Sequence, residues 1–119
     1  MSPAPLRERL RKALPAAMRA RDRAAVSALR SALAAIDNAE AVDRPTSADH
    51  GLAIGETPRG AGAADVARRT LSDADVERIV RMQVAESRAA AATYERAGET
   101  ARAEIMRAQA AALETHLTG

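Results

Sequence analysis

The sequence predicts an all-α protein of four helices, arranged as two helical hairpins joined by a long loop that contains Gly and Pro. Two observations favour this fold. Ala, the strongest helix former, supplies 32 of the 56 hydrophobic residues, and Arg and Glu carry most of the charge and also favour helices. Strand-preferring residues are scarce, because the chain has no Phe, no Trp and one Tyr. We therefore expect no strand.

The first helix is expected at residues 5–20. Its large apolar residues recur every four positions along one face, at Leu6, Leu10, Leu14 and Met18. Pro5 suits a first helical turn, where its missing N–H is not needed. Pro15 lies in the interior, where it is expected to kink or divide the helix.

The second helix is expected at residues 23–42, with Asp22 as its N-cap. Its apolar residues follow the spacing that a packed helix pair uses, at Val26, Leu29, Leu33 and Ile36. Because the break before Arg23 is short, the first two helices should form a hairpin.

The third helix, expected at residues 72–97, has the clearest start. Ser72 and Asp75 have the spacing of a capping box, and acidic side chains suit the positive first turn. Gly98 is expected to end this helix in a left-handed conformation. The fourth helix, at residues 100–117, follows so closely that the two must run antiparallel.

The length of the chain is sufficient for one domain, so we expect residues 1–119 to form a single domain. Apart from Ala, only 24 apolar residues are available, which makes a thin core. Close contacts across Ala-rich faces or burial in a homo-oligomer would both compensate. The expected core consists of Leu29, Leu33, Ile36, Val76, Val80, Ile105 and Leu113.

The two hairpins are separated by residues 43–71, which hold four of the six glycines together with Pro45 and Pro58. This segment is long for a connection inside a small domain. A flexible linker and an ordered strap along the helices both fit its composition.

Positive charge is concentrated at the beginning of the chain. Residues 1–30 hold eight basic and two acidic residues, a net charge of +6, and residues 31–119 hold ten basic and fourteen acidic residues, a net charge of −4. Such asymmetry is typical of an electrostatic docking end, although solvated helix flanks would give the same pattern. The candidate nucleic-acid-binding residues are Arg7, Arg9, Arg11, Lys12, Arg19, Arg21 and Arg23.

No catalytic, cofactor or metal site is predicted. His50 and His116 have no second His or Cys at metal-ligand spacing, and the chain has no cysteine at all. No segment has the length and apolar character of a membrane span or a secretory signal. These features favour a cytoplasmic binding protein that is neither an enzyme nor a membrane protein.

Taken together, the helical segments resemble the GatB/YqeY family, including its compact YqeY-like members. The resemblance covers the chain outside residues 43–70, and Tyr94-Glu95-Arg96-Ala97-Gly98 is its most specific segment. The other matching segments are Met18-Arg19-Ala20-Arg21-Asp22, Val26-Ser27-Ala28-Leu29-Arg30, Ala34-Ala35-Ile36-Asp37-Asn38, Leu71-Ser72-Asp73-Ala74-Asp75-Val76, Ala103-Glu104, Leu113-Glu114 and Leu117.

The resemblance implies a helical module similar to the tail region of GatB, a subunit of the tRNA-dependent amidotransferase. That carbon–nitrogen ligase uses glutamine as amide donor to convert Asp or Glu misacylated onto tRNA into Asn or Gln. Its tail is similar to a tRNA-contacting accessory, while the chemistry resides elsewhere. The resemblance therefore implies tRNA or an amidotransferase-type complex as partner. The alternative is a protein–protein interaction or homodimerising module with no nucleic-acid role.

Overall fold

The structure is a computed structural model that describes residues 4–41 and 70–117. These ranges contain no strand, and their four helices are α1 (Leu6–Arg19), α2 (Arg23–Glu40), α5 (Asp73–Arg96) and α6 (Thr100–Leu117). The all-α prediction is confirmed, and the helix ends fall within two residues of those expected. The linker or strap expected at residues 43–71 falls almost entirely outside the described residues. No helix in the described ranges is long and apolar enough to cross a membrane.

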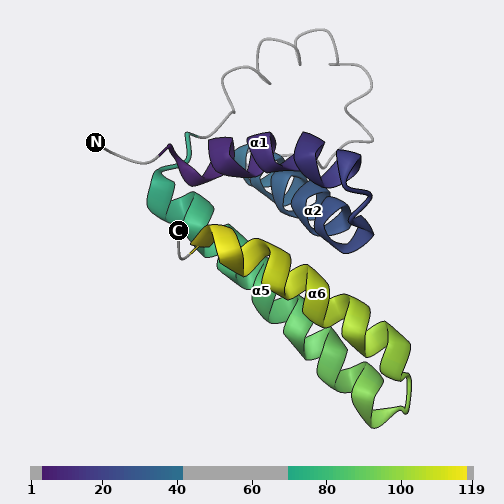
Figure 1. Cartoon of the computed structure of the whole chain (residues 1–119). Coiled ribbons are helices and arrows are strands. Elements are labelled where there is room, and N and C mark those ends of the chain that lie inside the picture. Colours follow the sequence, from purple (N-terminus) through teal and green to yellow (C-terminus); the bar gives the residue numbers. More distant parts are fainter. Residues whose placement is uncertain (1–3, 42–69, 118–119) are drawn as a thin grey trace, which may run out of the picture.

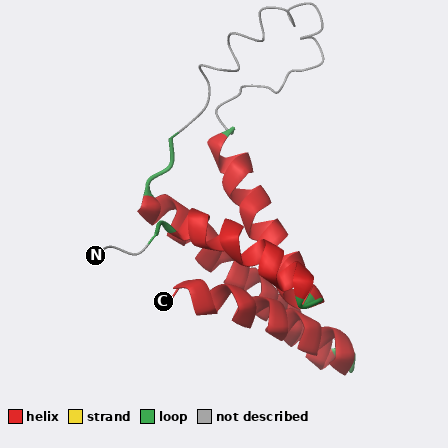
Figure 2. Ribbon diagram, turned by 45° about the horizontal axis from the view of Figure 1, so that its top comes forward, coloured by secondary structure: helices red, strands yellow, loops and turns green. Residues whose placement is uncertain are grey.

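The helices form two antiparallel hairpins, α1–α2 and α5–α6 (Figure 1). Helix α2 packs against both α5 and α6 and so joins the two hairpins. The far part of α5–α6 extends beyond the first hairpin as a two-helix arm (Figures 1 and 2). We call residues 88–107 the distal arm. The turns of the two hairpins are therefore separate features of the surface.

Helix α1 runs unbroken through Pro15, so Pro15 does not divide the helix, which was one of the two effects expected of it. Pro15 is exposed and lies on the face opposite Leu6, Leu10 and Leu14. The carbonyl of Arg11, which loses its helical donor at Pro15, is therefore on the solvent side, where water can hydrogen-bond to it. Leucine packing on the other face holds the helix together.

The predicted capping box at the start of α5 is confirmed. The hydroxyl of Ser72 accepts a hydrogen bond from the N–H of Asp75 at 3.1 Å, and the Asp75 carboxylate accepts one from the N–H of Ser72 at 3.0 Å. These bonds, together with the nearby Arg78, lower the pKa of Asp75. The predicted N-cap of α2 is confirmed as well, because the Asp22 carboxylate accepts from the N–H of Ala25 at 3.1 Å. Helix ends are thus set by local side-chain chemistry.

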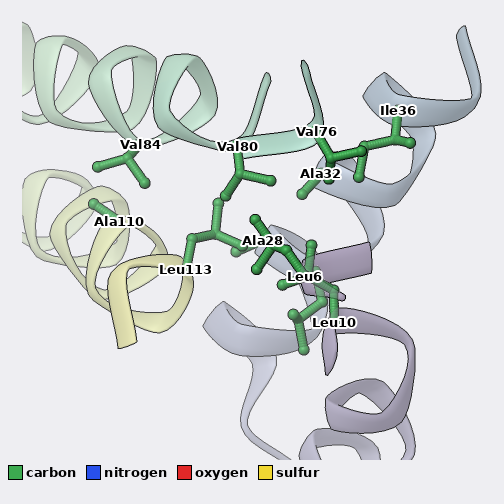
Figure 3. Close-up of a cluster of buried hydrophobic side chains, with 11 residues drawn as sticks. Leu6, Leu10, Ala28, Ala32, Ile36, Val76, Val80, Val84, Ala110 and Leu113 are labelled. Carbon is green, nitrogen blue, oxygen red and sulfur yellow. The ribbon is translucent and has the colours of Figure 1, made fainter. Parts of the chain in front are cut away.

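The core lies where the two hairpins meet, and all four helices contribute to it (Figure 3). Five of the thirteen buried hydrophobic residues are alanines. Ala28 and Ala32 of α2 and Ala110 of α6 are almost completely buried. Because these side chains are small, the helix backbones can approach closely. Alanine faces thus supplement the few large side chains, one of the two remedies that the composition predicted.

Two of the seven expected core residues differ from the prediction. Leu29, Ile36, Val76, Val80 and Leu113 are buried as expected. Leu33 packs against the core but is only partly buried. The prediction that Ile105 is buried is wrong, because its side chain is 50% exposed. Helix α6 has apolar residues on all sides, so the sequence did not reveal which side faces inward. Its buried face is formed by Ala103, Ala110 and Leu113.

We expect Ile36→Ala to lower the free energy of unfolding by about 2–5 kcal/mol, because Ile36 is fully buried and its loss leaves a cavity. Ile105→Ala is the matched control and should change it by less than about 0.5 kcal/mol. Urea titration followed by circular dichroism measures both. Equal losses would show that the burial of the two residues has been assigned wrongly.

Candidate nucleic-acid interface

The turn between α1 and α2 closes as a Schellman motif. The N–H of Asp22 donates to the carbonyl of Ala17 at 3.0 Å, and the N–H of Arg21 donates to the carbonyl of Met18 at 3.1 Å. Arg21 has a φ of 58°, in the left-handed region. In the described residues it is the one non-glycine residue with a positive φ.

Asp22 then begins the second helix immediately. Its carboxylate caps α2, and its carbonyl accepts from the N–H of Val26 at 3.0 Å. Because one residue ends α1 and starts α2, the connection is only three residues long. Arg19, Arg21 and Arg23 are thereby brought together at one tip, and all three side chains are exposed.

Arg11 and Lys12 continue the exposed basic surface along α1. Lys12 and Arg19 are seven residues apart, so they share a helix face at a separation of about 10 Å along the axis. Arg30 of α2 is also exposed and stands in the same relation to Arg23. Arg30 was not among the residues predicted from the sequence, although its seven-residue spacing from Arg23 is the signal that identifies it.

Arg7 has a different environment, at the start of α1. Its guanidinium forms two close contacts to Glu40, at 2.7 and 2.8 Å, and a longer one to Asp37 at 3.4 Å. The hydrogen bond to Glu40 is the main cause that raises the pKa of Arg7. Such a bidentate pair fixes both side chains. In this structure Arg7 therefore ties α1 to the end of α2.

Arg9 is also used inside the fold. It donates to the carbonyl of His116 at 2.6 Å and to the carbonyl of Ala4 at 3.0 Å. The His116 carbonyl belongs to the last turn of α6, where helical donors run out and positive charge is favourable. Arg9 thus holds the start of α1 against the end of α6. Of the seven candidate nucleic-acid-binding residues, Arg7 and Arg9 therefore make contacts within the fold, and the other five are exposed.

The ionic environment differs between the two hairpins. Residues 4–41 carry eight basic and four acidic residues, a net charge of +4, and residues 70–117 carry six and eight, a net charge of −2. On the second hairpin most arginines lie beside acidic partners, as in Arg81–Glu77 at 2.6 Å, Arg107–Glu95 at 3.3 Å and the close pair Arg88–Glu114. We define the basic tip as Arg11, Lys12, Arg19, Arg21, Arg23 and Arg30. Within residues 4–41 and 70–117, no member of the basic tip forms an ion pair.

The surface also contains two grooves outside the basic tip. An open groove of about 610 Å³ lies between α5 and α6, lined by Arg81, Val84, Arg88 and Leu117 among others. A smaller one of about 310 Å³ lies beside Arg9, Asp73 and Glu77. In the described ranges no group of three His, Cys, Asp or Glu side chains is placed to hold a metal ion. His50 lies outside those ranges.

The fold and the surface together define a helical protein of two hairpins with a cationic tip. No family model matches the chain, and no curated protein or solved structure is significantly similar to it. The resemblance to the GatB/YqeY family therefore remains a hypothesis carried by the sequence segments alone.

We expect the fold to lose stability as the pH falls through about 6.5. Burial of the imidazole, and then the positive charge of Arg9, lower the pKa of His116 below its usual value of 6.5. Between the lowered pKa and 6.5 the unfolded chain binds a proton that the folded chain does not, so stability decreases as pH falls through this window. The lowered pKa of Asp75 acts in a separate window, below its usual 3.8.

The measurement is the free energy of unfolding in urea between about pH 8 and pH 5. His116→Gln should lose less stability over this range than the wild type, because its side chain does not titrate. Identical pH profiles for the two proteins would contradict this role of His116.

Proposed function

We propose that this protein is a non-catalytic helical binding module that contacts tRNA through the basic tip of its first hairpin. The observation that carries the proposal is the concentration of cations without acidic partners on that hairpin, beside a second hairpin whose arginines are mostly paired with carboxylates. Cations that are not engaged in ion pairs can bind phosphate without first breaking one.

The charge distribution supports an oriented contact with a polyanion. Phosphates neutralised by Lys or Arg release condensed counterions, which favours binding and makes it dependent on salt. The net negative charge of residues 70–117 repels phosphate, so the first hairpin should face the nucleic acid. Because the cations project from several sides of α1 and α2, only a few can engage at once. Binding should therefore be weak and largely independent of sequence.

The choice of tRNA, and of an amidotransferase-type complex as the setting, rests on the resemblance to the GatB/YqeY family. A module similar to the GatB tail would act in the cytoplasm as an accessory that helps to hold tRNA while other subunits perform the chemistry. The order of the matching segments, from Met18 through Leu117, supports this assignment.

A protein–protein interaction or homodimerising module is the second candidate. It is favoured by the exposed apolar side chains of the second hairpin, since Met82 is 57% and Ile105 50% exposed. This candidate requires no contact through the basic tip.

Reversing the tip charges should abolish tRNA binding. We expect the wild type to bind in a filter-binding titration at about 50 mM salt and to weaken steeply by about 200 mM. The variant Arg19→Glu/Arg21→Glu/Arg23→Glu should not bind, although its helix content by circular dichroism should be unchanged because all three residues are exposed.

The charge-matched control is Arg96→Glu/Arg102→Glu/Arg107→Glu, which changes the net charge equally but on the distal arm. It should retain most of the affinity. Absence of salt-sensitive binding by the wild type, or equal losses in the two variants, would overturn the proposal. The second candidate would then lead, and sedimentation of the wild type and of Ile105→Glu would test for a dimer.

A further inference from the structure

The two hairpin turns of this protein have the same backbone construction. In the second turn, the N–H of Glu99 donates to the carbonyl of Tyr94 at 2.8 Å, and the N–H of Gly98 donates to the carbonyl of Glu95 at 3.0 Å. These bonds reproduce the pattern of Asp22 and Arg21 in the first turn. Gly98 has a φ of 78° and occupies the position that Arg21 occupies with a φ of 58°.

The residue at this position is not dictated by the turn. A left-handed conformation brings the Cβ of any residue except glycine too close to its own backbone, so glycine is the least costly choice. The chain uses glycine in the second turn and arginine in the first. The difference between the turns therefore requires a reason other than geometry.

Arg23 departs from a local preference in the same turn. It is the first residue of α2, where the helix dipole is positive and an acidic side chain would be favourable. Helix α5 follows this preference, with Asp73 and Asp75 in its first turn. Two residues that each oppose local stability thus lie two positions apart in one turn, and both add positive charge to the basic tip. Such departures from local consistency concentrate at functional sites.

Several backbone donors of this turn are already occupied. The N–H groups of Arg21, Asp22 and Ala25 donate to Met18, Ala17 and the Asp22 carboxylate, respectively. The Asp22 carboxylate also occupies the start of α2, where it would repel a phosphate, so side chains are the better ligands for an anion at the tip. Among these, a guanidinium offers two parallel donors that match two oxygens of a phosphate.

We propose that Arg21 is the principal phosphate ligand of the basic tip and that its left-handed backbone is a stability cost retained for binding. This inference rests on the proposed nucleic-acid contact and deepens it by assigning one residue. We therefore expect replacement of Arg21 by glycine to raise the stability of the fold and to lower the affinity for tRNA. If Arg21 served only packing or solubility, its replacement would change the stability alone.

The test compares Arg21→Gly with Arg19→Gln, which removes the same charge from an ordinary helical position. Arg21→Gly should raise the midpoint of thermal unfolding by about 2–5 °C, because glycine relieves the backbone. At about 50 mM salt it should weaken tRNA binding about tenfold, more than Arg19→Gln, and reduce the slope of log affinity against log salt by about one. Arg21→Lys keeps the charge but loses the two parallel donors of the guanidinium. Its affinity for tRNA should lie between those of the wild type and Arg21→Gly.

The reciprocal variant Gly98→Arg places the same side chain in the equivalent turn of the distal arm. A Cβ at Gly98 would meet nothing within 4 Å, so the variant changes the backbone conformation and adds one charge without a clash at the Cβ. This variant should lower the unfolding midpoint by a similar amount and leave tRNA affinity within about twofold of wild type.

The outcomes separate the two levels of the proposal. If wild type binds tRNA with salt dependence but Arg21→Gly loses no more affinity than Arg19→Gln, the tRNA contact stands and the assignment of Arg21 is overturned. A midpoint for Arg21→Gly that fails to rise also overturns it. If wild type does not bind tRNA at all, both the assignment and the proposed function are overturned.

Discussion

The shortage of large apolar side chains is the constraint on which the rest of the structure depends. With few leucines, isoleucines and valines, the chain can bury enough surface only where alanine faces let helices approach closely. Ala28 and Ala32 of α2 and Ala110 of α6 occupy that region, where all four helices meet (Figure 3). Beyond it, Ala91 and Ala103 let α5 and α6 continue together as the distal arm. The core therefore fixes how the hairpins pack and leaves the first turn and the distal arm outside.

Arginine has two roles in this arrangement, and its position along α1 decides which. At the start of the helix, Arg7 and Arg9 connect α1 to Glu40 and to the last turn of α6, and these polar contacts add to the burial of Leu6 and Leu10. Arg21 follows Arg9 by twelve residues and, at about 1.5 Å per residue, lies roughly 18 Å further along, at the exposed turn. The basic residues of the first hairpin thus fall into two groups. Arg7 and Arg9 stabilise the fold through polar contacts, and the cations of the basic tip are exposed to solvent.

Local chemistry explains what the sequence could predict. Helix positions follow from composition and apolar spacing, and the caps at Asp22 and Ser72 involve residues only three positions apart. The contact between Arg9 and His116 joins residues 107 positions apart, so it depends on how the hairpins pack. Ile105 was misassigned because apolar residues surround α6, which makes its inward face a property of the packing. The left-handed Arg21 was missed because the sequence signal for that conformation is glycine, as at Gly98.

The central claim, that the tip of the first hairpin is the surface that meets nucleic acid, is tested most directly by mapping the contact. Amide chemical shifts of the labelled protein, recorded by NMR during a titration with tRNA at low salt, report each residue separately. We expect the largest changes at residues 19–24 and at Arg30, and no change at residues 94–102 of the distal arm. Changes centred on Met82 and Ile105, or changes spread evenly over both hairpins, would contradict it.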